Sequence, residues 1–204
     1  METKFLLVSG ILAPLVYLAT DRIAGALLKG YSFSAGSMSE LGAAGSPVRP
    51  LVVALSLISS ALMIAFGIGA WQAAGSAILA RLVAVFILGN TVFGLIATLF
   101  FPNHYGVRPE FATPEVLVMA LSVLCSVLAI IFGALAFPGW FRVLSIAIPA
   151  AFVLLAILRF ATASTSGATV LIGVQERTMS YTFQAWTIAL AIELLLSSYK
   201  GVLR

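Results

Sequence analysis

The sequence predicts an all-α fold, an integral membrane bundle of six transmembrane helices. Apolar residues make up 62% of the chain and charged residues 9%, whereas about a quarter of an ordinary soluble domain is charged. So few polar residues cannot coat a soluble globule. The apolar residues also form runs of membrane-spanning length, about 20 residues each, separated by polar loops. We therefore expect one transmembrane domain over residues 1–204.

The first half of the chain holds three predicted spans. The first covers residues 5–27, which is too long and wrongly flanked for a cleavable signal peptide, and Pro14 predicts a kink in it. The second covers residues 51–71 and ends in small residues that permit close helix packing. The third covers residues 82–101. Its Asn90 is predicted to form a hydrogen bond between helices.

The second half holds the other three spans. The fourth is predicted at residues 115–136. The fifth covers residues 143–160, and Pro149 predicts a kink within it. The sixth covers residues 178–198.

Three long polar loops are expected on one side of the membrane. They cover residues 31–50, 101–115 and 162–177, and the first is the longest polar interruption in the chain. An even number of spans places both termini on the opposite side. Lysine and arginine numbers do not decide the orientation, but acids on the long-loop side are expected to pair with its arginines. We therefore predict cytoplasmic termini and a location in the cell (inner) membrane.

Several polar residues are expected to converge where the long loops meet the membrane. Ionisable groups at such depth are usually paired and face protein or a watery cavity. We predict a pocket there, which the hydroxyl groups of residues 32–39 also line. The alternative is that these residues form solvated loops and ion pairs that hold the span ends together. The candidate ligand-binding residues are Asp21, Ser37, Ser39, Glu40, Arg49, Glu115, Arg159 and Arg177.

The sequence excludes several kinds of chemistry. His104 is the single histidine, which excludes a bis-histidine haem and a multi-histidine zinc site. Cys125 is the single cysteine, so an intrachain disulfide is impossible, and no metal or cofactor is expected. The chain has no G-x-S-x-G nucleophile elbow, although a triad through His104 stays formally possible. Glu40 and His104 are the candidate acid–base residues, and no basic cluster predicts nucleic-acid binding.

Three segments resemble a known bacterial and archaeal family. They are SMSELGAAGSPVRP before the second span, FPN after the third, and GVQERTMSYTFQAW at the entry to the last. In this order they resemble the six-span membrane proteins of the domain of unknown function 998. That family often has an acid soon after FP and a histidine at the start of span four, where this chain has Asn103, His104 and Glu115. The resemblance implies the fold and the location of the site, and it implies no activity.

Three functions remain open on the sequence. The preferred one is binding of a membrane lipid or small amphiphile. Asp21 and Glu40 would pair with arginines, leaving Arg49, Arg159 or Arg177 for an anionic head group.

The alternative is a membrane enzyme that acts on a lipid head group through Glu40 or His104. The third is a small transporter that works as a homo-oligomer, with Asn90 and the proline kinks as moving parts. We rank it last because few polar residues are expected in the middle of the bundle.

Overall fold

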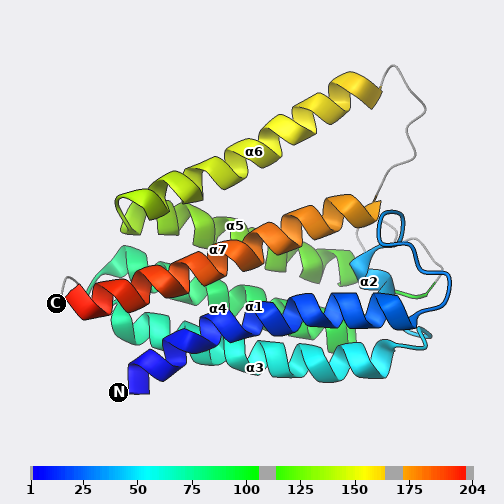
Figure 1. Ribbon diagram of the computed structural model, residues 1–204, viewed down its shortest axis with the longest axis horizontal. Helices are drawn as coiled ribbons and strands as arrows, with labels where there is room; N and C mark the ends of the chain where they lie inside the picture. The colour runs from blue at the N-terminus through cyan, green and yellow to red at the C-terminus, as the bar shows by residue number, and fades with distance from the viewer. Residues whose placement is uncertain (1, 106–113, 164–171, 201–204) are drawn as a thin grey trace.

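The computed structural model describes residues 2–105, 114–163 and 172–200, with only the backbone described at 115, 152–163, 172 and 198–200. This part of the chain is all-helical (Figure 1). The helices are α1 (Glu2–Leu27), α2 (Met38–Leu41), α3 (Arg49–Ala73), α4 (Ile78–Phe100), α5 (Pro114–Ala136), α6 (Trp140–Ala163) and α7 (Ile172–Lys200).

Five of these helices are long and apolar enough to cross a membrane, namely α1, α3, α4, α5 and α7. The sixth long helix, α6, is apolar over Trp140–Ala151, the stretch of it that was searched. The chain is therefore a multi-pass membrane protein. Helix α7 begins at Ile172, six residues before the predicted start of the last span. Glu176 and Arg177 consequently lie in its first turns and not in the preceding loop, as the sequence analysis had placed them.

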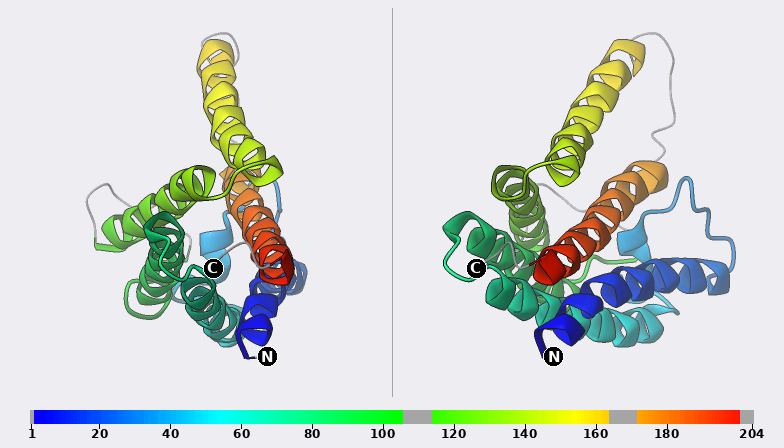
Figure 2. Two further views of the ribbon diagram at one scale, coloured as in Figure 1. Left: turned by 90° about the vertical axis from the view of Figure 1, so that its left-hand side faces the viewer. Right: turned by 60° about the vertical axis from the view of Figure 1, so that its left-hand side comes forward.

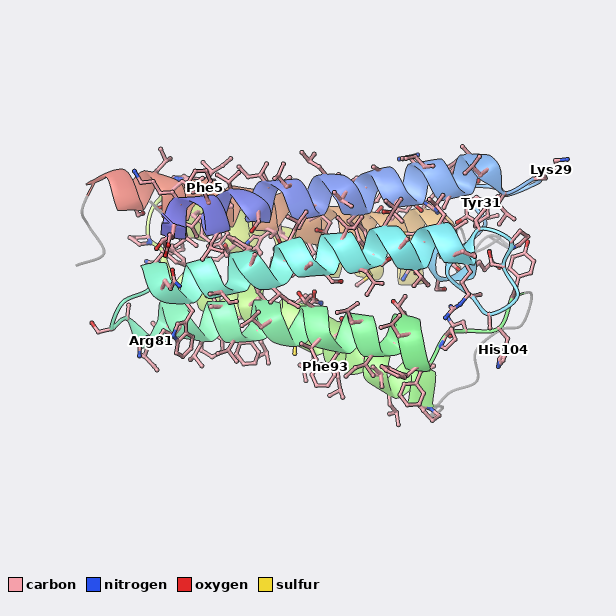
Figure 3. The ribbon with its side chains drawn as sticks, turned by 90° about the horizontal axis from the view of Figure 1, so that it is seen from below. Phe5, Lys29, Tyr31, Arg81, Phe93 and His104 are labelled. Atoms are coloured by element: carbon pink, nitrogen blue, oxygen red, sulfur yellow. The ribbon has the colours of Figure 1, made fainter. Side chains whose placement is uncertain are left out.

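The long helices run roughly side by side and define two ends of the bundle. Both ends of the described chain lie at one of them, which we call the terminal end (Figure 1). The connection from α1 to α3 lies at the other, which we call the loop end. Figure 3 shows Phe5 and Arg81 toward the terminal end and Tyr31 and His104 at the loop end.

Five helices surround a common axis. Helix α1 packs against α3 and α7, α3 packs against α4, and α4 packs against α5, as the end-on view in Figure 2 shows. Contacts between α5 and α7 are sparse. Helix α6 lies outside these five, near α5 and α7 at its N-terminal end, and diverges from them toward its C-terminal end (Figure 1).

The apolar core fills the terminal half of the bundle. Leu7 of α1, Phe66 of α3, Ile87 of α4 and Trp186 of α7 are all buried there. The Trp186 indole N–H donates to Ser145 Oγ of α6 at 2.9 Å, which satisfies its only hydrogen-bond donor without water. This half is closed by packed side chains, which leaves the loop half as the place for a site.

Close packing of α1 on α3 depends on glycine. A Cβ added at Gly69 would lie 2.7 Å from Leu6 Cβ and 3.1 Å from the Leu6 carbonyl carbon. Because the second of these atoms belongs to the backbone, it cannot rotate away. Small residues permit such close approach of membrane helices, as the small residues at the end of the second span predicted.

We expect Gly69→Ala to lower the free energy of unfolding by about 1–3 kcal/mol, the usual cost of overpacking. Gly94→Ala is the matched control, since its Cβ would meet Ser122 Oγ at an ordinary 3.8 Å. The free energy would be measured by SDS titration in mixed micelles. Equal stability of the two variants would show that α1 and α3 can separate slightly without lowering the free energy of unfolding.

Candidate functional site

The short helix α2 at the loop end is fixed by its own sequence. Ser37 Oγ accepts a hydrogen bond from the Glu40 amide, and Glu40 Oε2 accepts one from the Ser37 amide, both at 3.2 Å. This reciprocal pair is a capping box. Ser37 Oγ also lies 2.9 Å from Ser39 Oγ. The Glu40 carboxylate thus caps α2 and forms no ion pair among the described side chains.

A buried ion pair joins α7 to α1 beneath this loop. Arg177 Nη2 donates to Asp21 Oδ1 at 2.8 Å, and Arg177 Nε donates to Asp21 Oδ2 at 3.0 Å. Asp21 is 3% exposed and Arg177 is 6% exposed. The Tyr181 hydroxyl donates to the same carboxylate. The guanidinium plane suits such a two-point contact. Asp21 thus pairs with one of the three arginines that the sequence offered.

The remaining donors of Arg177 hold the loop between α1 and α2. Arg177 Nη1 donates to the Phe33 and Gly36 carbonyls at 2.6 and 3.0 Å, and Nη2 donates to the Tyr31 hydroxyl at 2.6 Å. Burial raises the pKa of the Tyr31 phenol above its ordinary value, against the opposing effect of Arg177. Tyr31 therefore stays neutral at physiological pH and donates to the Ser37 carbonyl at 2.7 Å.

Two further contacts fasten the loop end of the bundle. Arg49 donates to the Gly42 carbonyl and, through Nη2, to the Thr98 carbonyl at 3.1 Å. Ala44 forms an isolated β-bridge with His104, so the segment after α4 lies against the segment after α2. His104 itself is exposed. The Arg49 side chain and the backbone at His104 therefore hold neighbouring segments of the loop end together in this structure.

A cavity of about 550 Å³ occupies the loop half of the bundle. Its walls come from α1, α3, α4, α5 and α7, with Pro149 of α6 also contributing, and α2 lines its loop end. Of the predicted site residues, Asp21 and Ser39 line this cavity, whereas Ser37, Glu40, Arg49 and Arg177 do not. The predicted pocket just below the interface thus extends deeper into the bundle than the loop hydroxyls reach.

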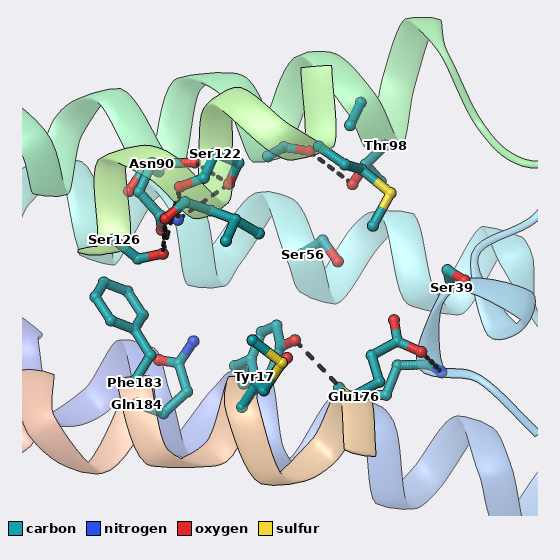
Figure 4. A pocket seen from close by; sticks show the side chains of 18 of the residues that line it. Tyr17, Ser39, Ser56, Asn90, Thr98, Ser122, Ser126, Glu176, Phe183 and Gln184 are labelled. Carbon is teal, nitrogen blue, oxygen red and sulfur yellow. Dashed lines mark hydrogen bonds between the residues drawn. The ribbon is translucent and has the colours of Figure 1, made fainter. Parts of the chain in front are cut away.

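Helix α7 supplies a polar stripe to the cavity wall. Glu176, Ser180 and Gln184 line it at intervals of four residues, which places them on one face of a helix. Figure 4 shows Glu176 near α2 and Gln184 farther in. Glu176 Oε2 accepts a hydrogen bond from the Met38 amide at 2.8 Å. The sequence analysis missed this stripe, although the spacing of three polar residues in the last apolar run could have revealed it.

The opposite wall is also polar at mid-depth. Asn90 Nδ2 of α4 donates to the Ser122 carbonyl and Oγ of α5, both at 3.0 Å, as Figure 4 shows. The interhelical hydrogen bond predicted for Asn90 is thereby confirmed. Ser126 and Ser56 also line the cavity. The expectation of few polar residues in the middle of the bundle is therefore wrong.

The cavity reaches the outer surface of the bundle along α5 and α7. Six of its lining residues are large, apolar and exposed, and one of them is Phe101 at the end of α4. Of the other five, four lie on α5 and one on α7, on either side of the sparse contact between these helices. They are Met119, Val123, Val127, Ile131 and Met179. We call these five residues the apolar rim. Because α5 and α7 are both candidate membrane spans, the apolar rim lies at membrane depth.

Two predicted site residues, Glu115 and Arg159, have side chains that lie outside the described part of the structure. Among the described residues, no three His, Cys, Asp or Glu side chains are grouped so that they could hold a metal ion. The described site is therefore one of carboxylates, amides and hydroxyls.

These features define a multi-pass integral membrane protein with a mostly apolar cavity that carries a few polar groups in the loop half of its bundle. The chain belongs to the family described as "Protein of unknown function (DUF998)", whose sequence profile matches residues 11–193. This confirms the resemblance seen in the three sequence segments. No curated protein and no solved structure matches the chain.

We expect Arg177→Lys, which keeps the positive charge but leaves buried acceptors unpaired, to lower the free energy of unfolding by about 1–3 kcal/mol. Lysine has no planar fork with which to hold Asp21 and the loop carbonyls together. Arg142→Lys is the control at an exposed turn, with an expected change within about 0.5 kcal/mol. The two variants would be compared by SDS titration, and similar stabilities would contradict a structural role for Arg177.

Proposed function

We propose that this protein binds a lipid or small amphiphile, which enters the cavity sideways from the bilayer past the apolar rim. The observation that carries this proposal is the combination of a polar wall inside and an apolar opening at membrane depth. An amphiphile can leave its chain at the apolar rim and place its polar group inside. A water-soluble ligand would have no use for an apolar entrance.

The dimensions and lining of the cavity support this proposal. Small-molecule sites are typically clefts of about 300–1,000 Å³ that are mostly apolar and carry a few convergent polar groups. The 550 Å³ cavity falls within that range. Its polar groups gather on two facing walls, Glu176 and Gln184 on α7 and Asn90 and Ser122 on α4 and α5.

Transport is the second candidate, and the polar side chains at mid-depth favour it. Asn90, Ser126 and Gln184 could line part of a path through the bundle. The packed core of the terminal half, with Phe66 and Trp186 fully buried, closes that path in this structure. A transporter would need a second arrangement of the helices. An enzyme acting through Glu40 or His104 has less support, because neither residue lines the cavity.

We further propose that α6 is the sixth span, and that both termini lie in the cytoplasm beneath the cell (inner) membrane. Helix α6 has 24 residues, enough to cross a bilayer. Six spans agree with the position of both ends of the described chain at the terminal end of the bundle (Figure 1).

Ligand retention tests the main proposal. Ser56 lies on the cavity wall and points into it (Figure 4), so Ser56→Phe should fill part of the cavity. We expect native mass spectrometry from mild detergent to show a defined lipid on the wild-type protein and its loss from Ser56→Phe. Ala54→Phe, on the exposed face of the same helix, should retain it. Equal retention by both variants, or a wild-type protein without bound lipid, would overturn the proposal.

Cysteine labelling tests the orientation. In a Cys125→Ser background, Ser34→Cys at the loop end should react with a membrane-impermeant maleimide in intact cells. Ser76→Cys, in the turn between α3 and α4, should react only after the cells are opened, because we place that turn in the cytoplasm. Both native serines are exposed. The reverse pattern would show that the termini face outward.

A further inference from the structure

The titratable lining of the cavity is acidic. Among the described residues that line it, the ionisable acids are Asp21 and Glu176, and none is Lys, Arg or His. The two acids occupy the loop end of the cavity, close to α2. Their different partners determine what the cavity can bind.

Asp21 already has its counter-ion. Both of its carboxylate oxygens accept hydrogen bonds from Arg177, and one also accepts from the Tyr181 hydroxyl. This is the one ion pair found among the described side chains. The negative charge of Asp21 is balanced inside the protein, so its carboxylate has little hydrogen-bonding capacity left for a ligand.

The partners of the Glu176 carboxylate differ from those of Asp21. Its Oε2 accepts from the Met38 amide at 2.8 Å, which is a neutral donor. Arg177 follows it in sequence, but successive helical side chains point about 100° apart, and the Arg177 donors are used by Asp21, Tyr31 and loop carbonyls. Of the two negative charges at the cavity, the one on Glu176 therefore has no cation in an ion pair among the described side chains.

Gln184 is the second polar residue of interest on this wall. It is 8% exposed, it lines the cavity, and its Oε1 is buried without a hydrogen-bond partner in the described structure. A buried acceptor without a partner is costly. Figure 4 shows the Gln184 amide on the cavity side of α7. The oxygen itself has almost no accessible surface, so Gln184 marks a costly buried polar position on α7 and is no contact for a ligand.

Neither Arg49 nor Arg177 offers a free donor to an anion. Arg49 donates to two backbone carbonyls, and the donors of Arg177 are all directed at protein acceptors. The anionic head group expected from the sequence thus has no support from these two residues. The charged group on the cavity wall without an ion pair among the described side chains is the Glu176 carboxylate, which favours a ligand with a positively charged donor.

We propose that the cavity selects amphiphiles that carry a protonated amine, with the Glu176 carboxylate as its counter-ion. This inference rests on the proposed binding function. It assigns the chemical class of the ligand. Glu176 receives the ammonium group at the loop end, and the alkyl chain leaves past the apolar rim.

Three probes of equal chain length separate charge from chain binding: dodecylamine, dodecanol and dodecyl phosphate. We expect purified protein in non-ionic detergent to bind dodecylamine at least about tenfold more tightly than the other two. Glu176→Gln should lower dodecylamine affinity about tenfold, the size of one charge-assisted hydrogen bond, and leave dodecanol unchanged. The glutamine can still accept from the Met38 amide, so α2 keeps its support. Glu193→Gln, on the same helix but outside the cavity lining, should change nothing.

The outcomes distinguish the two proposals. If the three probes bind equally and Glu176→Gln has no effect, the amine inference fails while the binding function stands. Preference for dodecyl phosphate also overturns the inference. If no probe binds and Ser56→Phe changes nothing, the binding function itself fails.

A second variant tests Gln184. Gln184→Leu removes the unpartnered acceptor, so the ligand-free protein should unfold at a higher temperature than the wild-type protein. A lower unfolding temperature would show that the Gln184 amide stabilises the bundle.

Discussion

The loop half of this protein depends on one buried contact, the pairing of Arg177 with Asp21. An unpaired charge at this depth would be costly, and the two-point contact removes that cost while joining α7 to α1. The same guanidinium then holds the loop backbone through Phe33 and Gly36. Gly173 makes this approach possible, because a Cβ there would lie 2.5 Å from the Phe33 carbonyl oxygen. One side chain thus positions two spans and the segment that covers the cavity.

The two halves of the bundle differ in packing and polarity. The terminal half is packed around Phe66 and Trp186, and the loop half holds a cavity with several polar groups on its walls. Hydrogen bonds such as Asn90 to Ser122 join helices across the hollow half. In a bilayer such contacts and close packing hold helices together, since lipid supplies no hydrophobic force between them. The stable half therefore supports a cavity that lacks a packed interior.

The sequence predicted a membrane protein and the approximate positions of its helices, because the length of an apolar run follows directly from bilayer thickness. The candidate site was harder to predict. Asp21 and Ser39 were identified as site residues, but Glu40 caps α2 and Glu176 had been assigned to a loop. Hydropathy cannot distinguish a polar residue that begins a helix from one that ends a loop. Pairing partners such as Arg177 and Asp21 lie 156 positions apart, so only the packing of α7 on α1 could select them.

The four residues of α2 are too few to form a helix by themselves, since starting a helix is unfavourable and short helices are marginal in water. Its order comes from the capping box and from the Met38 amide bound to Glu176. Local opening of such a segment requires far less free energy than global unfolding. The amide hydrogens of α2 should therefore exchange with solvent sooner than those of α3 or α4. The wall at the loop end of the cavity is thus its most easily opened part, and a ligand that displaced the Met38 amide from Glu176 would loosen it further.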